Sequence, residues 1–210
     1  MFIQQALTDP FLYFGWITFV VFSICCHEYA HAYTAWRFGD DTAARNGHLT
    51  LNPLVQMGIQ SLIMLALFGL AWGAVPVNPV AVRSAPKRAL IALSGPLMNL
   101  LLCLLFSLLM VIADVVGNPS AVHFLLIGGA VNGMLFVFNI LPVPVLDGFA
   151  VVSAFHPAFD RFAQKHATAI FLIFILLLWN SPLDSFIFAA GYALEAAFVA
   201  FFHSLAALLF

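Results

Sequence analysis

Residues 24–33 read "ICCHEYAHAY" and place two histidines and a glutamate inside an otherwise apolar stretch. His27 and His31 are four positions apart, so on a helix both imidazoles face the same side and can bind one metal ion. Glu28 follows the first histidine, and its carboxylate can take a proton from a water that the metal activates. Two neutral imidazoles, one further protein ligand and one open position suit Zn²⁺. The pattern therefore predicts a hydrolytic zinc site with one ion per chain.

The composition indicates that this site lies within a membrane. Of the 210 residues, 64% are hydrophobic and only 8% are charged, whereas a soluble domain carries about 25% charged residues. The apolar stretches are long and lack the alternation of outer-membrane barrel strands. Ionisable side chains within a membrane are costly and mark function. We therefore expect an all-α polytopic membrane protein whose buried histidines and glutamate perform chemistry.

Several classes of protein and site are excluded by the same counts. A net charge of -2 with seven Lys and Arg residues leaves no basic patch for nucleic acid. Three cysteines, of which Cys25 and Cys26 are adjacent, form neither a disulfide framework nor a cysteine zinc site. We expect a single membrane domain over residues 1–210, with a catalytic core over about 11–150 and C-terminal helices over about 160–210.

The apolar stretches predict a bundle of about five transmembrane helices. The predicted spans are residues 11–38, 89–112, 121–146, 167–181 and 186–206. After the first span, residues 45–53 and 74–82 alternate over short runs broken by Asn, Pro and Gly. These two runs predict short strands, so that a β-hairpin or re-entrant segment containing the short apolar residues 58–72 follows the first helix.

Charge placement favours the hairpin over a complete crossing by residues 58–72. All seven Lys and Arg residues fall in three clusters, at residues 37–45, 83–88 and 161–165. A hairpin puts all three clusters on one face, which the positive-inside rule makes cytoplasmic. A complete crossing would put the first two clusters on opposite faces. We therefore predict an integral multi-pass protein whose active site lies toward the cytoplasmic side.

The third metal ligand must be one of the few acidic residues within or at the ends of the spans. These residues are Asp114, Asp147, Asp184 and Glu195. Asp147 differs from the others because it follows the proline-broken segment "FNILPVPVLDGF", which interrupts a span at the depth inferred for His31. Asp147 is therefore the predicted third ligand. Glu195, in the last span, is read as a helix–helix hydrogen bond or as a residue beyond a misplaced boundary.

Three segments, in this order, resemble the motifs of the site-2 protease family of intramembrane zinc metalloproteases. They are "HEYAH" at 27–31, "SGPLMN" at 94–99 and "NILPVPVLDG" at 139–148. The resemblance covers roughly residues 15–150 and fits the short form of the family, which lacks PDZ and CBS domains. It implies that His27, His31 and Asp147 bind zinc and that Glu28 is the general base.

The resemblance also implies a role for Asn139, which would bind the substrate carbonyl or stabilise the oxyanion. An interhelical hydrogen bond is an equally good reading of this amide. We interpret Asn99 and Asn132 as structural, and Gly95 and Pro96 as allowing close approach of helices. His48 is kept as a substrate-side candidate.

The reaction implied by the resemblance is hydrolysis of a peptide bond in or near a transmembrane segment. The partners would be the lipid bilayer of a bacterial or archaeal cell and a membrane-protein substrate, single-span or trimmed beforehand. The sequence is also compatible with a homo-oligomer. The substrate could pair with an edge of the strands predicted at 45–53 and 74–82. The alternatives are a membrane metal-ion carrier, which leaves Glu28 unexplained, and a catalytically dead regulator that binds membrane helices.

Overall fold

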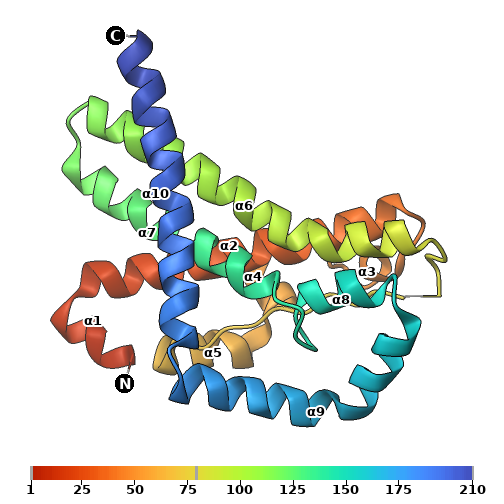
Figure 1. Ribbon diagram of the computed structural model, residues 1–210. Coiled ribbons are helices and arrows are strands. Elements are labelled where there is room, and N and C mark those ends of the chain that lie inside the picture. The colour runs from red at the N-terminus through yellow and green to blue at the C-terminus, as the bar shows by residue number, and fades with distance from the viewer. Residues whose placement is uncertain (1, 79, 210) are drawn as a thin grey trace.

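The computed structural model describes residues 2–78 and 80–209, and long helices make up most of the chain (Figure 1). Three of them lie side by side with alternating direction, and the last long helix crosses them steeply (Figure 1). The three are α2 (Pro10–Arg37), α6 (Ala85–Val115) and α7 (Pro119–Asn139), and the crossing helix is α10 (Leu183–Leu209). The all-α prediction is therefore confirmed.

Local sequence explains where these helices begin. The Asp9 carboxylate caps α2 by accepting a hydrogen bond from the Leu12 amide at 3.0 Å, and Pro10 occupies the first turn. Asn118 caps α7 in the same way through the Ala121 amide at 3.1 Å. The 28 residues of α2 match the span predicted at 11–38.

Four helices are long and apolar enough to cross a membrane, namely α2, α6, α7 and α10, so this is a membrane protein. The prediction of about five spans is one too many within the described residues. The remaining long helix, α9 (Pro157–Asn180), is not among the four, although it contains the apolar segment Lys165–Leu178.

The β-hairpin predicted after the first helix is not present, and the described residues contain no strand. Residues 45–53 instead border two helical turns, α3 (Thr42–Arg45) and α4 (Pro53–Gln56). Asn52 caps α4 through the Leu54 amide at 3.0 Å, and this cap favours a helical turn over an extended strand. Because residues 45–53 do not form a strand, residues 70–78 have no partner strand among the described residues and are extended without belonging to a sheet.

Residues 46–82 nevertheless turn back on themselves along α2. The segment forms α5 (Gly58–Phe68) and then the extended stretch of residues 70–78. The Tyr13 hydroxyl donates to the Ala66 carbonyl at 2.8 Å, which places the end of α5 beside the first turns of α2. The extended stretch then returns, and the Asn78 amide reaches Asp40, just beyond the other end of α2, at 2.6 Å.

A break separates α7 from the short helix α8 (Asp147–Ser153). The predicted span 121–146 overran this point, since α7 ends at Asn139. Pro142 and Pro144 explain the difference, because proline lacks an amide donor and stops a helix. Beyond α8, α9 runs away from the break and returns toward α10 (Figure 1).

Candidate metal centre

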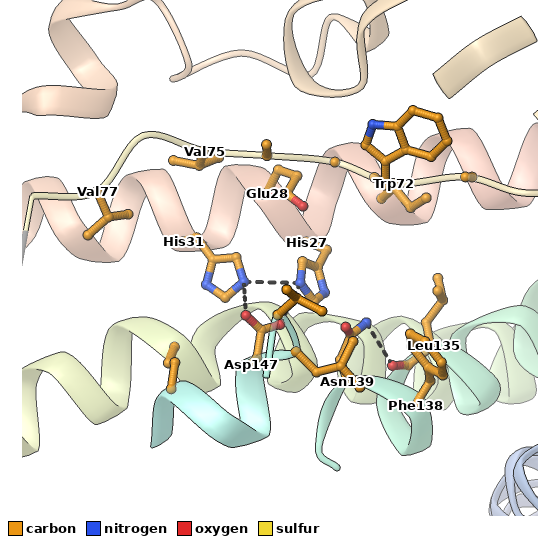
Figure 2. A pocket seen from close by; sticks show the side chains of 18 of the residues that line it. His27, Glu28, His31, Trp72, Val75, Val77, Leu135, Phe138, Asn139 and Asp147 are labelled. Carbon is orange, nitrogen blue, oxygen red and sulfur yellow. Dashed lines mark hydrogen bonds and ion pairs between the residues drawn. The ribbon is translucent and has the colours of Figure 1, made fainter. Parts of the chain in front are cut away.

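Two histidines of α2 and the first residue of α8 meet across the bundle. His27 Nε2 lies 2.9 Å and His31 Nε2 lies 3.2 Å from the two carboxylate oxygens of Asp147. The two Nε2 atoms are 3.0 Å apart, and Figure 2 shows both rings directed at the carboxylate. The three ligand atoms lie within 4.8 Å of one another, and the histidines are buried. The structure thus brings together the three residues that the sequence predicts as ligands.

Hydrogen bonds on the far side of each imidazole define which nitrogen carries the proton. His31 Nδ1 lies 2.7 Å from the Ile91 carbonyl, which can only accept. His27 Nδ1 lies 2.6 Å from Asn99 Oδ1, which is also an acceptor. Each Nδ1 therefore donates, so each neutral ring presents an unprotonated Nε2 to Asp147.

This donor set fits a zinc ion. Three acceptor atoms that face one another repel unless a cation lies among them. Ligand atoms about 2.0–2.2 Å from a tetrahedral zinc are separated by about 3.3–3.6 Å, and the spacing of 2.9–3.2 Å is only slightly shorter. His₂Asp also leaves a fourth position open, as a hydrolytic site requires.

Space for an ion depends on Gly95 of α6. A Cβ atom at this position would collide with Nε2 of both His27 and His31. The backbone of α6 can approach α2 this closely only because position 95 has no side chain. Gly95 therefore lies against the two ligand atoms, and the predicted close helix approach is observed.

The turn before α8 aims the Asp147 carboxylate. Val145 adopts φ 79°, a conformation that a β-branched residue rarely occupies. A Cβ at Gly148 would collide with the Ile140 carbonyl, so only glycine fits there. The carboxylate oxygens of Asp147 therefore face Nε2 of His27 and His31.

Glu28 lies next to the ligands, between α2 and the extended stretch, as Figure 2 shows. The glutamate is buried at 8% exposure, and a Cβ at Gly73 would collide with its carboxylate. The glycine thus leaves the room that Glu28 occupies. Asn139, at the end of α7, lines the same cavity, and its amide nitrogen donates to the Leu135 carbonyl at 3.1 Å.

The cavity that contains these residues has a volume of about 1380 Å³. One wall carries His27, Glu28 and His31, and the extended stretch forms a second wall. The wall formed by the C-terminal helices is mainly apolar and includes Phe171, Ile175, Leu178, Ile187 and Phe188. Two charged residues of the lining, Asp160 and Asp184, also belong to these helices.

Three hydrogen-bonded anchors hold the extended stretch beside Glu28. Ser61 Oγ bonds both the amide and the carbonyl of Trp72, at 2.9 and 2.7 Å. The Ala74 amide donates to the Gln56 carbonyl at 3.1 Å. The third anchor is the bond from Asn78 to Asp40. Between these anchors, no hydrogen bond with a described residue engages the amides of Val75 and Val77.

Asp40 holds its anchor as an ionised acceptor. One carboxylate oxygen accepts from the Thr42 amide at 3.0 Å and the other from the Asn78 amide at 2.6 Å. Burial raises the pKa of Asp40, but these hydrogen bonds outweigh burial, so the pKa lies below its ordinary value. No separate signal in the sequence marks Asp40, because an aspartate after a glycine is typical of a loop.

Two further residues singled out from the sequence lie outside the ligand set. His48 is 3.3 Å from Gln56 Oε1, and the buried Gln56 donates to the carbonyls of His48 and Thr50. Gln56 thus connects this loop with the extended stretch, a role that sequence reasoning missed. Glu195 is 3% exposed between α10 and α7, and its Oε1 has no hydrogen-bond partner among the described residues.

Comparison with known proteins identifies the family. The chain is 34% identical over 196 residues to "Putative zinc metalloprotease YwhC" of Bacillus subtilis, covering 85% of this chain and 89% of the relative. It is 34% identical over 191 residues to "Putative zinc metalloprotease Rip2" of Mycobacterium tuberculosis, covering 85% and 70%. The chain belongs to the site-2 protease family. No protein-family model matches the chain, and no solved structure matches it.

In this member of the site-2 protease family, all three motifs meet at one place. The histidines of residues 27–31 come from α2, the glycine and asparagine of residues 94–99 come from α6, and the aspartate of residues 139–148 opens α8. The second and third motifs each place groups beside the imidazoles of the first: Gly95 and the Asn99 acceptor from α6, and the Asp147 carboxylate from α8.

Proposed function

We propose that this protein is an intramembrane zinc metalloprotease that hydrolyses peptide bonds in or near transmembrane segments of membrane proteins. The observation that carries the proposal is the convergence of His27, His31 and Asp147 beside Glu28 on the wall of a large cavity. The printed names of the relatives, which are zinc metalloproteases, support the same reaction class.

The roles of the residues follow from their positions. His27, His31 and Asp147 would hold the ion, which when bound supplies a Lewis acid that polarises a carbonyl and lowers the pKa of water. Glu28 takes the proton of the attacking water and returns it to the leaving amine. Asn139, which lines the same cavity, donates a hydrogen bond to the scissile carbonyl oxygen.

The cavity is suited to an apolar chain that approaches from the lipid. Apart from Asp160 and Asp184, the far wall carries aliphatic and aromatic side chains from α9 and α10, which contact a peptide without directional hydrogen bonds. A helical substrate must unwind before its carbonyl can react, because helical carbonyls are already hydrogen-bonded. The amides of Val75 and Val77, which pair with no described residue, offer an edge on which the unwound segment can pair.

We further propose that the site opens toward the cytoplasm of a multi-pass protein in a bacterial or archaeal cell membrane. The Lys87 ammonium lies 5.5 Å from the centroid of the Phe38 ring, so the first two basic clusters adjoin. Arg88 donates to the Ala154 carbonyl at 3.2 Å, which brings α8 to the same end. Clustering of positive charge at one end of the bundle supports a cytoplasmic location for that end.

The deciding experiment compares the wild type with Glu28→Gln and Asp147→Ala, measuring zinc per protein and cleavage of candidate membrane substrates. We expect about one zinc in the wild type and in Glu28→Gln, and loss of zinc in Asp147→Ala. Cleavage should fall by about 10²- to 10⁴-fold in Glu28→Gln, because the general base is removed. Full cleavage by Glu28→Gln would contradict the proposed role of this residue.

Pairing along the extended stretch has its own test. Val77→Pro removes the Val77 amide, whereas Val77→Ala keeps the amide and shortens the side chain. Cleavage should decrease with proline and persist with alanine, while both variants retain zinc. Equal cleavage by the two variants would eliminate pairing at this amide. The carrier and regulator alternatives gain no support, because neither accounts for the names of the relatives.

A further inference from the structure

We infer that Asn99 and Asn132 are positioning residues that fix the metal-binding tautomer of His27. The inference deepens the proposed function, since it concerns the same metal site. Both asparagines are completely buried, and neither is a ligand. They form a chain of hydrogen bonds from the backbone of α7, through α6, to the imidazole on α2.

This series of hydrogen bonds begins at a group that can only accept. The Gly128 carbonyl accepts a hydrogen bond from Asn132 at 2.8 Å. A carbonyl has no proton to donate, so the atom of Asn132 that faces it must be the amide nitrogen. The same nitrogen lies 2.8 Å from Ser23 Oγ. The other atom of the Asn132 amide, which points toward α6, is therefore the oxygen.

Each later step follows from the one before. The oxygen of Asn132 lies 3.1 Å from Asn99, and this atom of Asn99 must be its nitrogen, because two facing oxygens would repel. The Asn99 oxygen is then the atom at 2.6 Å from His27 Nδ1. An oxygen at this place requires a proton on Nδ1. Consequently Nε2 of His27 is unprotonated and available to a metal.

The group that keeps the proton on Nδ1 thus differs between the two histidines. The backbone carbonyl of Ile91 keeps the proton on His31 Nδ1, and no substitution of a side chain removes it. The proton on His27 Nδ1 depends on the amide orientation of Asn99, which in turn depends on Asn132. Substitution at position 132, on a different helix from both histidines, should therefore alter metal binding.

The loss of Asn132 acts through rotation of Asn99. In Asn132→Leu, the Asn99 amide has no acceptor on α7 and can turn its nitrogen toward His27. An amide nitrogen favours an unprotonated Nδ1, which moves the proton to Nε2 and blocks the ligand atom. Zinc affinity should then fall by about 10- to 100-fold, as for other partners that orient metal ligands.

Conservative variants separate this role from simple packing. In Asn99→Asp, an aspartic acid of the same shape can donate to Asn132 and accept from His27, so zinc affinity should be retained. Asn99→Leu has a similar volume but no acceptor, and zinc affinity should fall. Ser107→Ala is the matched control, because Ser107 is equally buried on α6 but bonds Cys103 and takes no part in the hydrogen bonds that reach His27.

The test has two readouts on detergent-purified protein, neither of which requires a substrate. Zinc affinity is measured by competition with a chelator for the wild type and the four variants. The protonated nitrogen of His27 is measured by ¹⁵N NMR of metal-free protein at pH ~9, above the ordinary imidazole pKa of about 6.5. The NMR measurement is repeated in the Asp147→Ala background, where no carboxylate holds a second proton on the ring.

We expect the proton on Nδ1 in the wild type, a partial shift to Nε2 in Asn132→Leu, and normal affinity in Asn99→Asp and Ser107→Ala. A wild-type ring protonated at Nε2 overturns the inference, even if a leucine variant does not fold. Unchanged zinc affinity in Asn132→Leu also overturns it. A protein with the expected tautomer and zinc affinity that cleaves no peptide would overturn the proposed function and leave the inference standing.

Discussion

The two sides of the cavity differ in how their side chains are held. On the side of α2, α6 and α7, His27, Asn99 and Asn132 are buried and joined in one chain of directional hydrogen bonds. On the side of α9 and α10, residues such as Phe171 and Phe188 contribute apolar surface, and only 17% of the apolar window of α10 is buried. The corresponding share in α2 and α6 is 50%.

This difference matches two physical requirements. A metal ion needs donors fixed in direction, because coordination is lost when a ligand atom turns away. Apolar contact has no direction and depends mainly on the area removed from water or lipid. Substitutions that displace or reorient the metal-binding groups on the first side should therefore weaken or abolish zinc binding, whereas substitutions on the second side should change only how well a substrate fits.

The largest effect is expected from Gly95→Ala on the metal side. The added methyl group would lie against Nε2 of both His27 and His31. Bound zinc should fall from about one per chain to near zero, as elemental analysis of the purified protein would measure. Retention of one zinc by a folded Gly95→Ala protein would show that the close approach of Gly95 to the two histidines is not required for metal binding.

A smaller effect is expected from Asp40→Asn, which lies beyond the ligands but anchors the extended stretch. The amide nitrogen of asparagine would face one of the backbone amides of Thr42 and Asn78, so one of the two hydrogen bonds that hold this anchor in place is lost. Cleavage should fall by up to about 10²-fold through misplacement of the substrate, with zinc unchanged. Asp41→Asn is the control, since the Asp41 carboxylate is half-exposed and pairs with Arg45.

The same aspartate predicts a dependence of stability on pH. Because the pKa of Asp40 is below its ordinary value in the folded protein, its stabilisation is present above an unfolded-state pKa of about 3.9. The stabilisation is lost as the pH falls through the lower, folded-state pKa. The free energy of unfolding of the wild type should exceed that of Asp40→Asn by about 1 kcal/mol at pH ~6, and this difference should shrink below pH ~3. Thermal unfolding of both proteins would measure it, and a constant difference would argue against an ionised anchor.

The smallest effect is expected on the apolar side. Phe188→Ala removes a ring that lines the cavity, whereas Phe186→Ala removes an exposed ring of the same helix that does not. The KM for an apolar substrate should rise about threefold to tenfold in Phe188→Ala, and zinc content should be normal in both. Loss of zinc in Phe188→Ala would remove the distinction between the two sides.

The sequence predicted the parts of the fold that local rules control. Asp9 and Pro10 start α2, and its 28 residues agree with the predicted span to within one residue at each end. The end of α7 was placed seven residues too late, although Pro142 marked it, because the apolar run continues through the break. The strands at 45–53 and 74–82 were wrong because alternation is only a local signal, and a sheet requires a partner.

By itself, the sequence determined the family and nominated the three residues that gather at the candidate metal site. Spacing places His27 and His31 on one helical face, and two prolines break an apolar stretch just before an aspartate. Only the tertiary structure decided which groups orient them, because hydrogen bonds among α2, α6 and α7 join residues 72 and 33 positions apart. Asn99 and Asn132 read from sequence as structural asparagines, and contacts between helices have no periodic signature along the chain.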